Sequence, residues 1–242
     1  MSKDPNRKNQ SNRKNASGKI GRDLTVRVKS ARGRKHSSTR WLQRQLNDPY
    51  VVAAQRAGLR SRSAFKLEDL DNKFKFLKSN MRIIELGAAP GGWTQVLVNR
   101  LGTRKVGTKS KIIAIDVQEM APMHGAQILQ LDFMSNNAIN IIKKALGGKA
   151  NAVLSDMSPK MTGHSVTDHI RIMDLTETAY DFAKEVLSPG GCFVSKVFQG
   201  GTGKDLLNDI KLSFSQVRHA KPPSSRAESA EMFVVAKNYL KS

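Results

Sequence analysis

Three aspartates stand directly after three short apolar runs of the chain. Asp116 closes "KIIAID", Asp132 closes "QILQLD" and Asp156 closes "VLSD". A single acid at such a place caps the following helix as often as it binds a ligand. Three in succession favour a binding site, where the Asp116 carboxylate can accept hydrogen bonds from both hydroxyls of a ribose and Asp132 can meet an adenine amino group.

A glycine-rich stretch, "RIIELGAAPGGWTQVL", stands where a predicted strand passes into a predicted helix. Glycine permits unusual backbone angles and close approach, and ligands of open α/β sheets bind beyond the carboxyl ends of the strands. Gly87, Gly91 and Gly92 therefore fall where a cofactor would sit.

Two common phosphate-binding motifs do not fit this chain. The dinucleotide fingerprint G-x-G-x-x-G fails because two alanines follow Gly87. In "FQGGTGKDL", a Walker loop would need glycine where Phe198 stands and Ser or Thr where Asp205 stands. These exclusions leave a ligand that carries a ribose and a base but no pyrophosphate.

Strands and helices alternate through most of the chain, which predicts a mostly parallel sheet covered on both faces. The predicted strands are Arg82–Glu85, Lys111–Asp116, Gln127–Leu131, Ala152–Asp156, Cys192–Phe198 and Met232–Lys237, with a weaker one at Val217–His219. The predicted helices between them are Trp93–Leu101, Ser135–Leu146, Asp168–Leu187 and Gly203–Phe214.

Two further helical patterns precede the sheet. "STRWLQRQLNDPYVVAAQRAG" has helical apolar spacing up to about Gly58, and "SRSAFKLEDLDNKFKFL" forms a second amphipathic helix that Ser61 or Ser63 could cap. "LGTRKVGTKSK" is an exposed loop, and "MTGHSVTDH" is interpreted as a mobile loop over a substrate cleft.

Positive charge is concentrated at the N-terminus of a chain whose net charge is +21. Residues 1–45 contain 14 Lys or Arg and only two acids, Asp4 and Asp23. Such an excess indicates a polyanionic partner, above all a nucleic acid. We predict a disordered RNA-binding extension over residues 1–36 and a catalytic domain over residues 37–242; an inert solubilising tail is the alternative.

The remaining composition excludes several classes of protein. Cys192 is the only cysteine, which rules out an internal disulfide. The first residues contain no apolar signal region and no apolar run approaches a membrane span, so a cytoplasmic protein is expected. The five histidines are scattered and predict no metal site.

Six segments, taken in order, resemble the FtsJ (RlmE) family of ribosomal RNA 2′-O-methyltransferases. They are "ELGAAPGGW", "IIAID", "LQLDF", "LSDMSP", "SPGGCFVSKVFQG" and "KPPSSRAESAEMFVVAK", and the similarity covers residues 60–237. The resemblance implies a Rossmann-like class I methyltransferase with a seven-stranded, mostly parallel sheet. It also implies S-adenosylmethionine as cofactor and 2′-O-methylation of a uridine near the peptidyl-transferase region of 23S-type large-subunit rRNA, on the 50S subunit.

The resemblance also implies roles for particular residues. Glu231 is preferred to Glu228 because the family's glutamate directly precedes the last strand. The cofactor-binding positions are Gly91, Trp93, Asp116, Asp132 and Asp156, together with Gly87 from the glycine-rich turn, and the catalytic positions are Lys66, Asp156, Lys196 and Glu231.

A ribose hydroxyl is a poor nucleophile, so the protein must align it and accept its proton. We expect two lysines beside a sulfonium to disfavour each other's charge, which leaves Lys196 neutral in the complex and able to act as the base. Asp156 would orient Lys196, while Lys66 and Glu231 hold the ribose. The alternatives are that Lys196 reaches solvent from its strand and that Lys66 is an ordinary exposed helix lysine.

Two departures from the family's pattern and two rival functions remain. The N-terminal segment is longer than in a minimal member, and Ser158 stands where Ala is common. The rivals are a non-catalytic RNA-binding assembly factor, which the four intact catalytic positions disfavour, and a methyltransferase for a small metabolite, which the charge disfavours. A monomer without metal is expected.

Overall fold

A computed structural model describes residues 36–160, 162–200 and 203–241. The chain divides into two compact units, Met1–Pro49 and Tyr50–Ser242. All of the predicted RNA-binding extension except its last residue, His36, lies outside the described residues. In the first unit the described structure is the helix α1, His36–Leu46.

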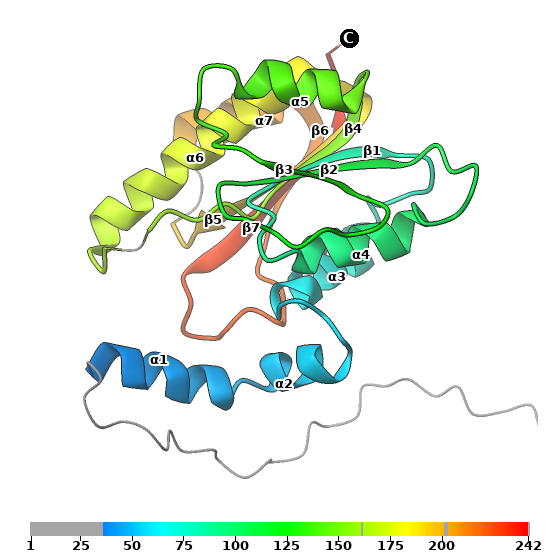
Figure 1. Cartoon of the computed structure of the whole chain (residues 1–242). Helices are drawn as coiled ribbons and strands as arrows, with labels where there is room; N and C mark the ends of the chain where they lie inside the picture. The colour runs from blue at the N-terminus through cyan, green and yellow to red at the C-terminus, as the bar shows by residue number, and fades with distance from the viewer. Residues whose placement is uncertain (1–35, 161, 201–202, 242) are drawn as a thin grey trace, which may run out of the picture. The chain divides into compact units, whose positions relative to one another are not determined.

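The second unit is built on one seven-stranded sheet with the strand order β3-β2-β1-β4-β5-β7-β6 (Figure 1). Neighbouring strands are parallel except for β7, which runs antiparallel to both β5 and β6. The strands are β1 (Arg82–Leu86), β2 (Lys111–Asp116), β3 (Gln127–Gln130), β4 (Ala150–Ser155), β5 (Leu187–Phe198), β6 (Phe214–Ala220) and β7 (Glu231–Tyr239).

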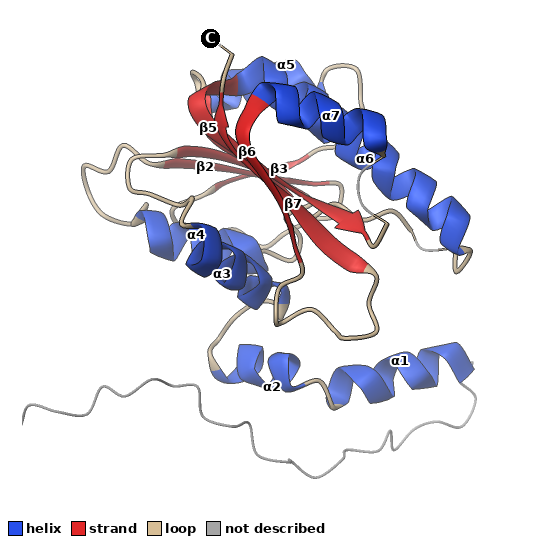
Figure 2. Ribbon diagram, turned by 180° about the vertical axis from the view of Figure 1, so that it is seen from behind, coloured by secondary structure: helices blue, strands red, loops and turns tan. Residues whose placement is uncertain are grey.

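Helices cover both faces of this sheet, as the alternating sequence pattern predicts (Figure 2). The helices α3 (Ser63–Phe74) and α4 (Gly92–Leu101) pack on one face, where their apolar side chains share a core with Ile83 and Val194. The helices α5 (Ala138–Leu146), α6 (Ser165–Val186) and α7 (Lys204–Ser213) pack on the other face.

Burial explains why the central strands lack a polar face. Ile83 and Ile84 of β1 are both fully buried, because one side chain points to each helical layer. Parallel strands covered on both faces read as continuous apolar runs rather than as an alternation. The strand order changes direction between β1 and β4, because β2 and β3 follow β1 on one side and β4 begins the other side. Such sheets bind ligands at this switch point.

The predicted single helix before Gly58 is wrong. The structure instead ends α1 at Leu46 and starts α2 (Pro49–Arg56) at Pro49. Proline has no backbone N–H to donate, and it disfavours the helical conformation of the residue before it. The apolar spacing continues across this break, and for that reason the pattern alone concealed it.

The predicted serine cap is also wrong. No side chain caps the first turn of α3; the hydroxyl groups of Ser61 and Ser63 instead form a hydrogen bond with each other at 2.6 Å.

Candidate functional site

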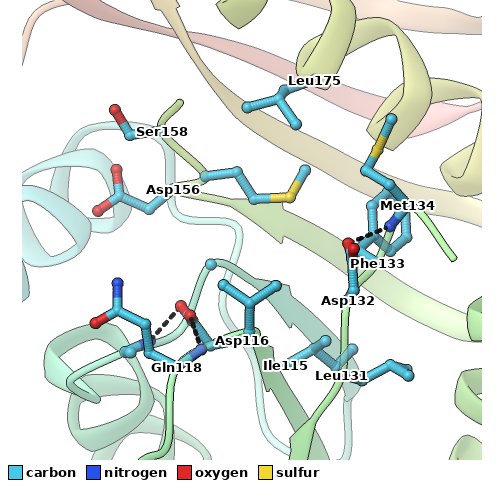
Figure 3. Close-up of a pocket in the computed structure, with 14 residues that line it drawn as sticks. Ile115, Asp116, Gln118, Leu131, Asp132, Phe133, Met134, Asp156, Ser158 and Leu175 are labelled. Carbon is cyan, nitrogen blue, oxygen red and sulfur yellow. Dashed lines mark hydrogen bonds between the residues drawn. The ribbon is translucent and has the colours of Figure 1, made fainter. Parts of the chain in front are cut away.

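A cavity of about 270 Å³ lies beyond the carboxyl ends of β1, β2 and β4. Figure 3 shows Asp116, Asp132 and Asp156 around it, together with Ser158 and Leu175. The predicted position of a ligand site, at the ends of successive strands, is therefore where this cavity lies. The full lining is Gly87, Ala89, Ile115, Asp116, Val117, Gln118, Leu131, Asp132, Phe133, Met134, Asp156, Met157, Ser158 and Leu175.

Asp116 is held in place by the backbone around it. Its Oδ2 accepts a hydrogen bond from the N–H of Ala89 at 2.9 Å, and its Oδ1 accepts one from the N–H of Gln118 at 2.8 Å. A carboxylate has about four lone-pair positions, so two remain for a ligand. The side chain is therefore fixed in one orientation and is still able to bind two hydroxyl groups.

Asp132 lies in the next segment of the cavity wall, which follows β3. Its Oδ1 accepts a hydrogen bond from the N–H of Met134 at 2.9 Å, which turns the chain after β3 (Figure 3). Phe133, Met134 and Leu131 give this side of the cavity an apolar surface. An apolar slot with one acceptor at its end can take a flat heteroaromatic ring that carries an amino group.

Gly87 lies where β1 meets the segment after β4. Its φ is +75°, and a Cβ there would lie 2.7 Å from the backbone N of Met157. No flexible side chain could yield at that contact, so only glycine fits. The residue lines the cavity and lets the backbone of Asp156 and Met157 approach it closely.

Gly91 and Trp93, two of the predicted cofactor-binding residues, do not line the cavity. Trp93 is 2% exposed, and its ring centroid lies 5.6 Å from that of Phe233. Its indole N–H donates a hydrogen bond to the carbonyl oxygen of Ser63 at 2.9 Å. Trp93, which the resemblance places among the cofactor-binding residues, therefore has its large apolar ring in the core beneath α3 and not at the cavity.

The four predicted catalytic residues meet beside the cavity. The ammonium of Lys196 lies 2.8 Å from Oδ1 of Asp156 and 3.9 Å from Oε2 of Glu231. The ammonium of Lys66 lies 2.6 Å from the same Oε2 atom. All four side chains are at most 14% exposed, so the two lysines are not ordinary surface residues.

These four residues come from four separate elements. Lys196 is in β5, Glu231 is the first residue of β7, and the two are brought near each other by the antiparallel pairing of those strands. Lys66 comes from α3 on one face of the sheet, and Asp156 directly follows β4. A buried ammonium is costly unless it is paired, and each lysine here has a carboxylate partner.

Neighbouring charges shift the pKa values of Lys196 and Glu231. Burial alone would lower the pKa of Lys196, but the carboxylates of Asp156 and Glu231 outweigh it and raise that pKa. Burial alone would raise the pKa of Glu231, but Lys66 and Lys196 outweigh it and lower that pKa. Without a ligand, Lys196 is therefore an ammonium at neutral pH. The neutral Lys196 expected from the sequence refers to the complex with the cofactor, so it stays a prediction.

Sequence reasoning missed Ser225, which supports the cluster. Its hydroxyl donates a hydrogen bond to Oε1 of Glu231 at 2.9 Å, while Lys66 holds Oε2. Both oxygens of the glutamate are thereby fixed. The serine pair in "KPPSSRAES" was the only signal, and serine in a polar segment is too common to single out.

Glu85 was also missed, although it stands inside the glycine-rich stretch. It is 1% exposed, and its Oε2 accepts a hydrogen bond from the hydroxyl of Thr94 at 2.8 Å. Its Oε1 has no hydrogen-bond partner among the described residues. Burial raises the pKa of this carboxyl to about 8, so Glu85 is mostly protonated at neutral pH.

The segment between Asp156 and α6 is anchored by one carboxylate. Asp168 accepts hydrogen bonds from the backbone N–H and the hydroxyl of Thr162, both at 2.8 Å, and from the N–H of Gly163 at 3.0 Å. These bonds lower the pKa of Asp168. The loop predicted over "MTGHSVTDH" is too long, because residues 165–169 already belong to α6. The mobility of the residues before Ser165 stays a prediction, and Met161 lies outside the described residues.

Among the helices that the structure describes, none has the length and apolar character needed to cross a membrane.

Comparison with known proteins points to one family. A profile described as FtsJ-like methyltransferase matches residues 59–239. A protein of Paramagnetospirillum magneticum named ribosomal RNA large subunit methyltransferase E is 54% identical over 96% of both chains. A protein of the same name from Parvibaculum lavamentivorans is 54% identical over 92% of this chain and 91% of its own.

A solved structure shows a similar fold. The crystal structure from Plasmodium falciparum, whose description reads ribosomal RNA methyltransferase, is 32% identical to this chain with a TM-score of 0.66. It covers 76% of this chain and is itself covered completely. The expected class I methyltransferase fold is thereby confirmed.

Proposed function

The chain belongs to the FtsJ-like methyltransferase family, and on that premise we propose that it transfers a methyl group from S-adenosylmethionine to a ribose 2′-hydroxyl of large-subunit ribosomal RNA. The acceptor is a uridine of 23S-type rRNA in the 50S subunit. Relatives that align over nearly their whole length are named for methylation of large-subunit rRNA, which supports this substrate.

One observation carries the proposal: Asp156 belongs both to the cavity and to the lysine–carboxylate cluster. Asp156 lines the cavity, and its Oδ1 lies 2.8 Å from the ammonium of Lys196. A cofactor in the cavity and a ribose at the cluster would thus meet at one side chain. Positioning two reactants in this way supplies much of the rate enhancement of a transfer reaction.

We assign the binding of the cofactor to the residues of the cavity. Asp116 would accept hydrogen bonds from the two ribose hydroxyls, Asp132 would accept one from the adenine amino group, and Gly87 would keep the floor open. Leu131 and Phe133 would enclose the base. When bound, S-adenosylmethionine supplies a methyl group that its sulfonium already activates.

We assign the acceptance of the proton to Lys196. Its amino group must lose one proton to solvent before it can take the 2′-hydroxyl proton, because its pKa is raised in the ligand-free protein. A cationic ligand beside Lys196 would favour that loss. Asp156 orients the amine and stabilises the ammonium that forms when the hydroxyl proton arrives.

We assign the positioning of the ribose to Lys66 and Glu231. Lys66 can donate hydrogen bonds to an acceptor at the cluster while it remains paired with Glu231. Glu231 is fixed by Lys66 and Ser225, so the direction of its carboxylate is already set before the substrate arrives. Preorganised groups of this kind lose no further energy by reorganising during the reaction.

The charge distribution supports RNA as the substrate, since a net charge of +21 favours a polyanion. We propose that residues 1–36 form an RNA-binding extension next to a catalytic domain over residues 37–242. We also propose that the protein acts as a monomer in the cytoplasm, where it would meet the large subunit during or after assembly.

The proposal is tested by mapping ribose methylation after incubation with S-adenosylmethionine and unmethylated 50S subunits. We expect one new 2′-O-methyluridine with the unchanged protein and none with Lys196→Ala, although that variant still binds S-adenosylhomocysteine. Free 23S rRNA in a parallel reaction decides whether the assembled subunit is required. Methylation by Lys196→Ala at the normal rate would overturn the assigned base, and no methylation by either protein would favour a non-catalytic assembly factor.

A further inference from the structure

Arg60 connects two loops that are far apart in the sequence. Its Nη1 donates a hydrogen bond to the carbonyl oxygen of Ala121, and its Nη2 donates one to the carbonyl oxygen of Pro122, both at 2.8 Å. Nη1 also lies 3.4 Å from the carbonyl oxygen of Pro90. One guanidinium therefore contacts the glycine-rich turn and the segment between β2 and β3.

The backbone of Arg60 is fixed from a third side. Its N–H donates a hydrogen bond to Oε1 of Gln95 at 2.5 Å, and Nε2 of Gln95 donates one to the carbonyl oxygen of Gly58 at 3.1 Å. Gln95 belongs to α4, the helix that the glycine-rich turn begins. Because hydrogen bonds fix both its main chain and its guanidinium, Arg60 is a structural residue of this part of the fold.

Gly91 is the residue that makes room for this arginine. A Cβ at Gly91 would lie 2.9 Å from Nη1 and 3.0 Å from Cδ of Arg60, and the φ of Gly91 is +105°. Side chains rarely adopt that backbone conformation. The backbone conformation by itself favours glycine at this position, and Arg60 and Met120 pack against it.

The segment held by Arg60 continues directly from the wall of the cavity. Asp116, Val117 and Gln118 line the cavity, and Ala121 and Pro122 follow within a few residues. Between them Met120 is 8% exposed and packs with Ala88 and Ala114. The position of the carbonyl groups that Arg60 binds is therefore coupled to the position of the side chains that face the ligand.

We propose that Arg60 is a positioning residue for the cofactor site, and that it maintains the Asp116–Gln118 wall against the glycine-rich turn. The inference rests on the proposed function, since it takes the cavity to be the cofactor site. The usual interpretation of a partly buried arginine in an RNA enzyme is a phosphate contact. Both terminal nitrogens of Arg60 instead point to carbonyl oxygens of the protein itself.

The test compares cofactor binding with RNA binding in matched variants. Affinity for S-adenosylhomocysteine is measured by calorimetry for the unchanged protein, Arg60→Gln, Arg60→Lys, Asp116→Asn and Arg218→Gln. Arg218 is an exposed residue of the edge strand β6, so Arg218→Gln controls for the loss of one positive charge. Steady-state KM for the RNA substrate is measured over a range of salt concentrations.

We expect Arg60→Gln to weaken S-adenosylhomocysteine binding about tenfold, because two charge-assisted hydrogen bonds are lost. Arg60→Lys should weaken it about threefold, since an ammonium cannot present the same fork to two carbonyl groups. Arg218→Gln should have no effect. In Arg60→Gln, backbone amides of residues 117–126 should exchange hydrogen faster, while those of β2 remain protected.

The dependence of KM on salt distinguishes the two interpretations. A lost phosphate contact would reduce the slope of log KM against log salt by about one unit, whereas the positioning role leaves the slope unchanged. Normal S-adenosylhomocysteine affinity in Arg60→Gln, or a reduced slope, would overturn the inference. If Arg60→Gln does not fold, Arg60→Lys decides by the same two measurements.

Asp116→Asn separates this inference from the proposed function. If it weakens binding of S-adenosylhomocysteine while Arg60→Gln does not, the inference about Arg60 is wrong and the cofactor site stands. If neither variant weakens binding, the cavity is not the cofactor site and both proposals are wrong.

Discussion

Lys66 and Glu231 are 165 residues apart in the sequence and form an ion pair at 2.6 Å. Lys66 comes from α3 and Glu231 from the start of β7. The pair joins a helix on one face of the sheet to the strand ends where Lys196 and Asp156 meet. The geometry of the cluster thus depends on how firmly α3 is attached to the sheet.

Lys66→Met is expected to lower kcat about 10²- to 10³-fold, the range typical of a residue that positions or activates a reacting group. Affinity for S-adenosylhomocysteine should not change, because Lys66 does not line the cavity. Single-turnover methylation and calorimetry measure the two quantities. Lys73→Met, on an exposed position of the same helix, is the matched control and should retain full activity. Reduced S-adenosylhomocysteine affinity in Lys66→Met alone would place Lys66 in the cofactor site instead.

The rate of methyl transfer should rise with pH, because the base form of Lys196 is required. Asp156 and Glu231 raise the pKa of Lys196 above its ordinary value. The amine is therefore a minority form throughout the neutral range, and its fraction increases about tenfold per pH unit. A plot of log(kcat/KM) for S-adenosylmethionine at subsaturating RNA reports the ligand-free protein, and against pH it should have a slope near one from about pH 6.5 to about pH 9, without a plateau.

Lys196→Arg provides the control for this pH dependence. Arginine keeps the positive charge but cannot release its proton in a protein, so the variant should be inactive at every pH. If Lys196 instead stabilised negative charge as an ammonium, Lys196→Arg would keep substantial activity and the profile would fall at high pH. Those two results together would show that Lys196 is not the general base.

The sequence predicted the strand ends near the site well, for physical reasons. "KIIAID" is an uninterrupted apolar run between two charged residues, and β2 spans exactly those six residues, Lys111–Asp116. The start of β5 was harder. The structure begins that strand at Leu187, five residues before the predicted Cys192, although Pro189 and Gly190 are typical of a turn.

The site was only partly predictable, because spatial neighbours separated by many residues leave no local signal. Asp116 and Asp132 could be placed at strand ends from the apolar runs alone. The proximity of Lys66 and Lys196 came only from the family resemblance. Trp93 was misplaced because a tryptophan next to glycines can face either a ligand or the core, and only the packing of α3 decides between them.

The buried carboxyl of Glu85 should make the protein less stable as the pH rises. Its pKa is raised from 4.5 to about 8 in the folded protein. Above pH 4.5 the unfolded chain loses this proton while the folded chain keeps it, so the free energy of unfolding falls between the two values. From pH 5.5 to pH 8 this group alone should remove about 3 kcal/mol.

Glu85→Gln tests the origin of that pH dependence. Glutamine has nearly the same shape and does not titrate, so the variant should lose stability less steeply over the same interval. Urea unfolding at pH 5.5 and pH 8 measures the free energies for both proteins. An equal pH dependence in the two proteins would show that Glu85 does not titrate as the burial predicts.

Trp93→Phe should slow methyl transfer without weakening cofactor binding. Phenylalanine keeps an aromatic ring against Phe233 but removes the N–H that donates to the carbonyl oxygen of Ser63. Ser63 begins α3, and Lys66 is in the first turn of that helix. A loosened first turn shifts Lys66, and we expect kcat to fall about threefold to tenfold.

The Lys66→Met background shows whether the effect of Trp93 passes through Lys66. Residues that act through one another have non-additive effects, so Trp93→Phe should lower kcat little further once Lys66 is methionine. Fully additive losses would mean that Trp93 acts by another route. Weaker S-adenosylhomocysteine binding in Trp93→Phe alone would instead mean that the indole contacts the cofactor, as the sequence first indicated. Because the ring is 2% exposed and outside the cavity lining, we expect the non-additive result.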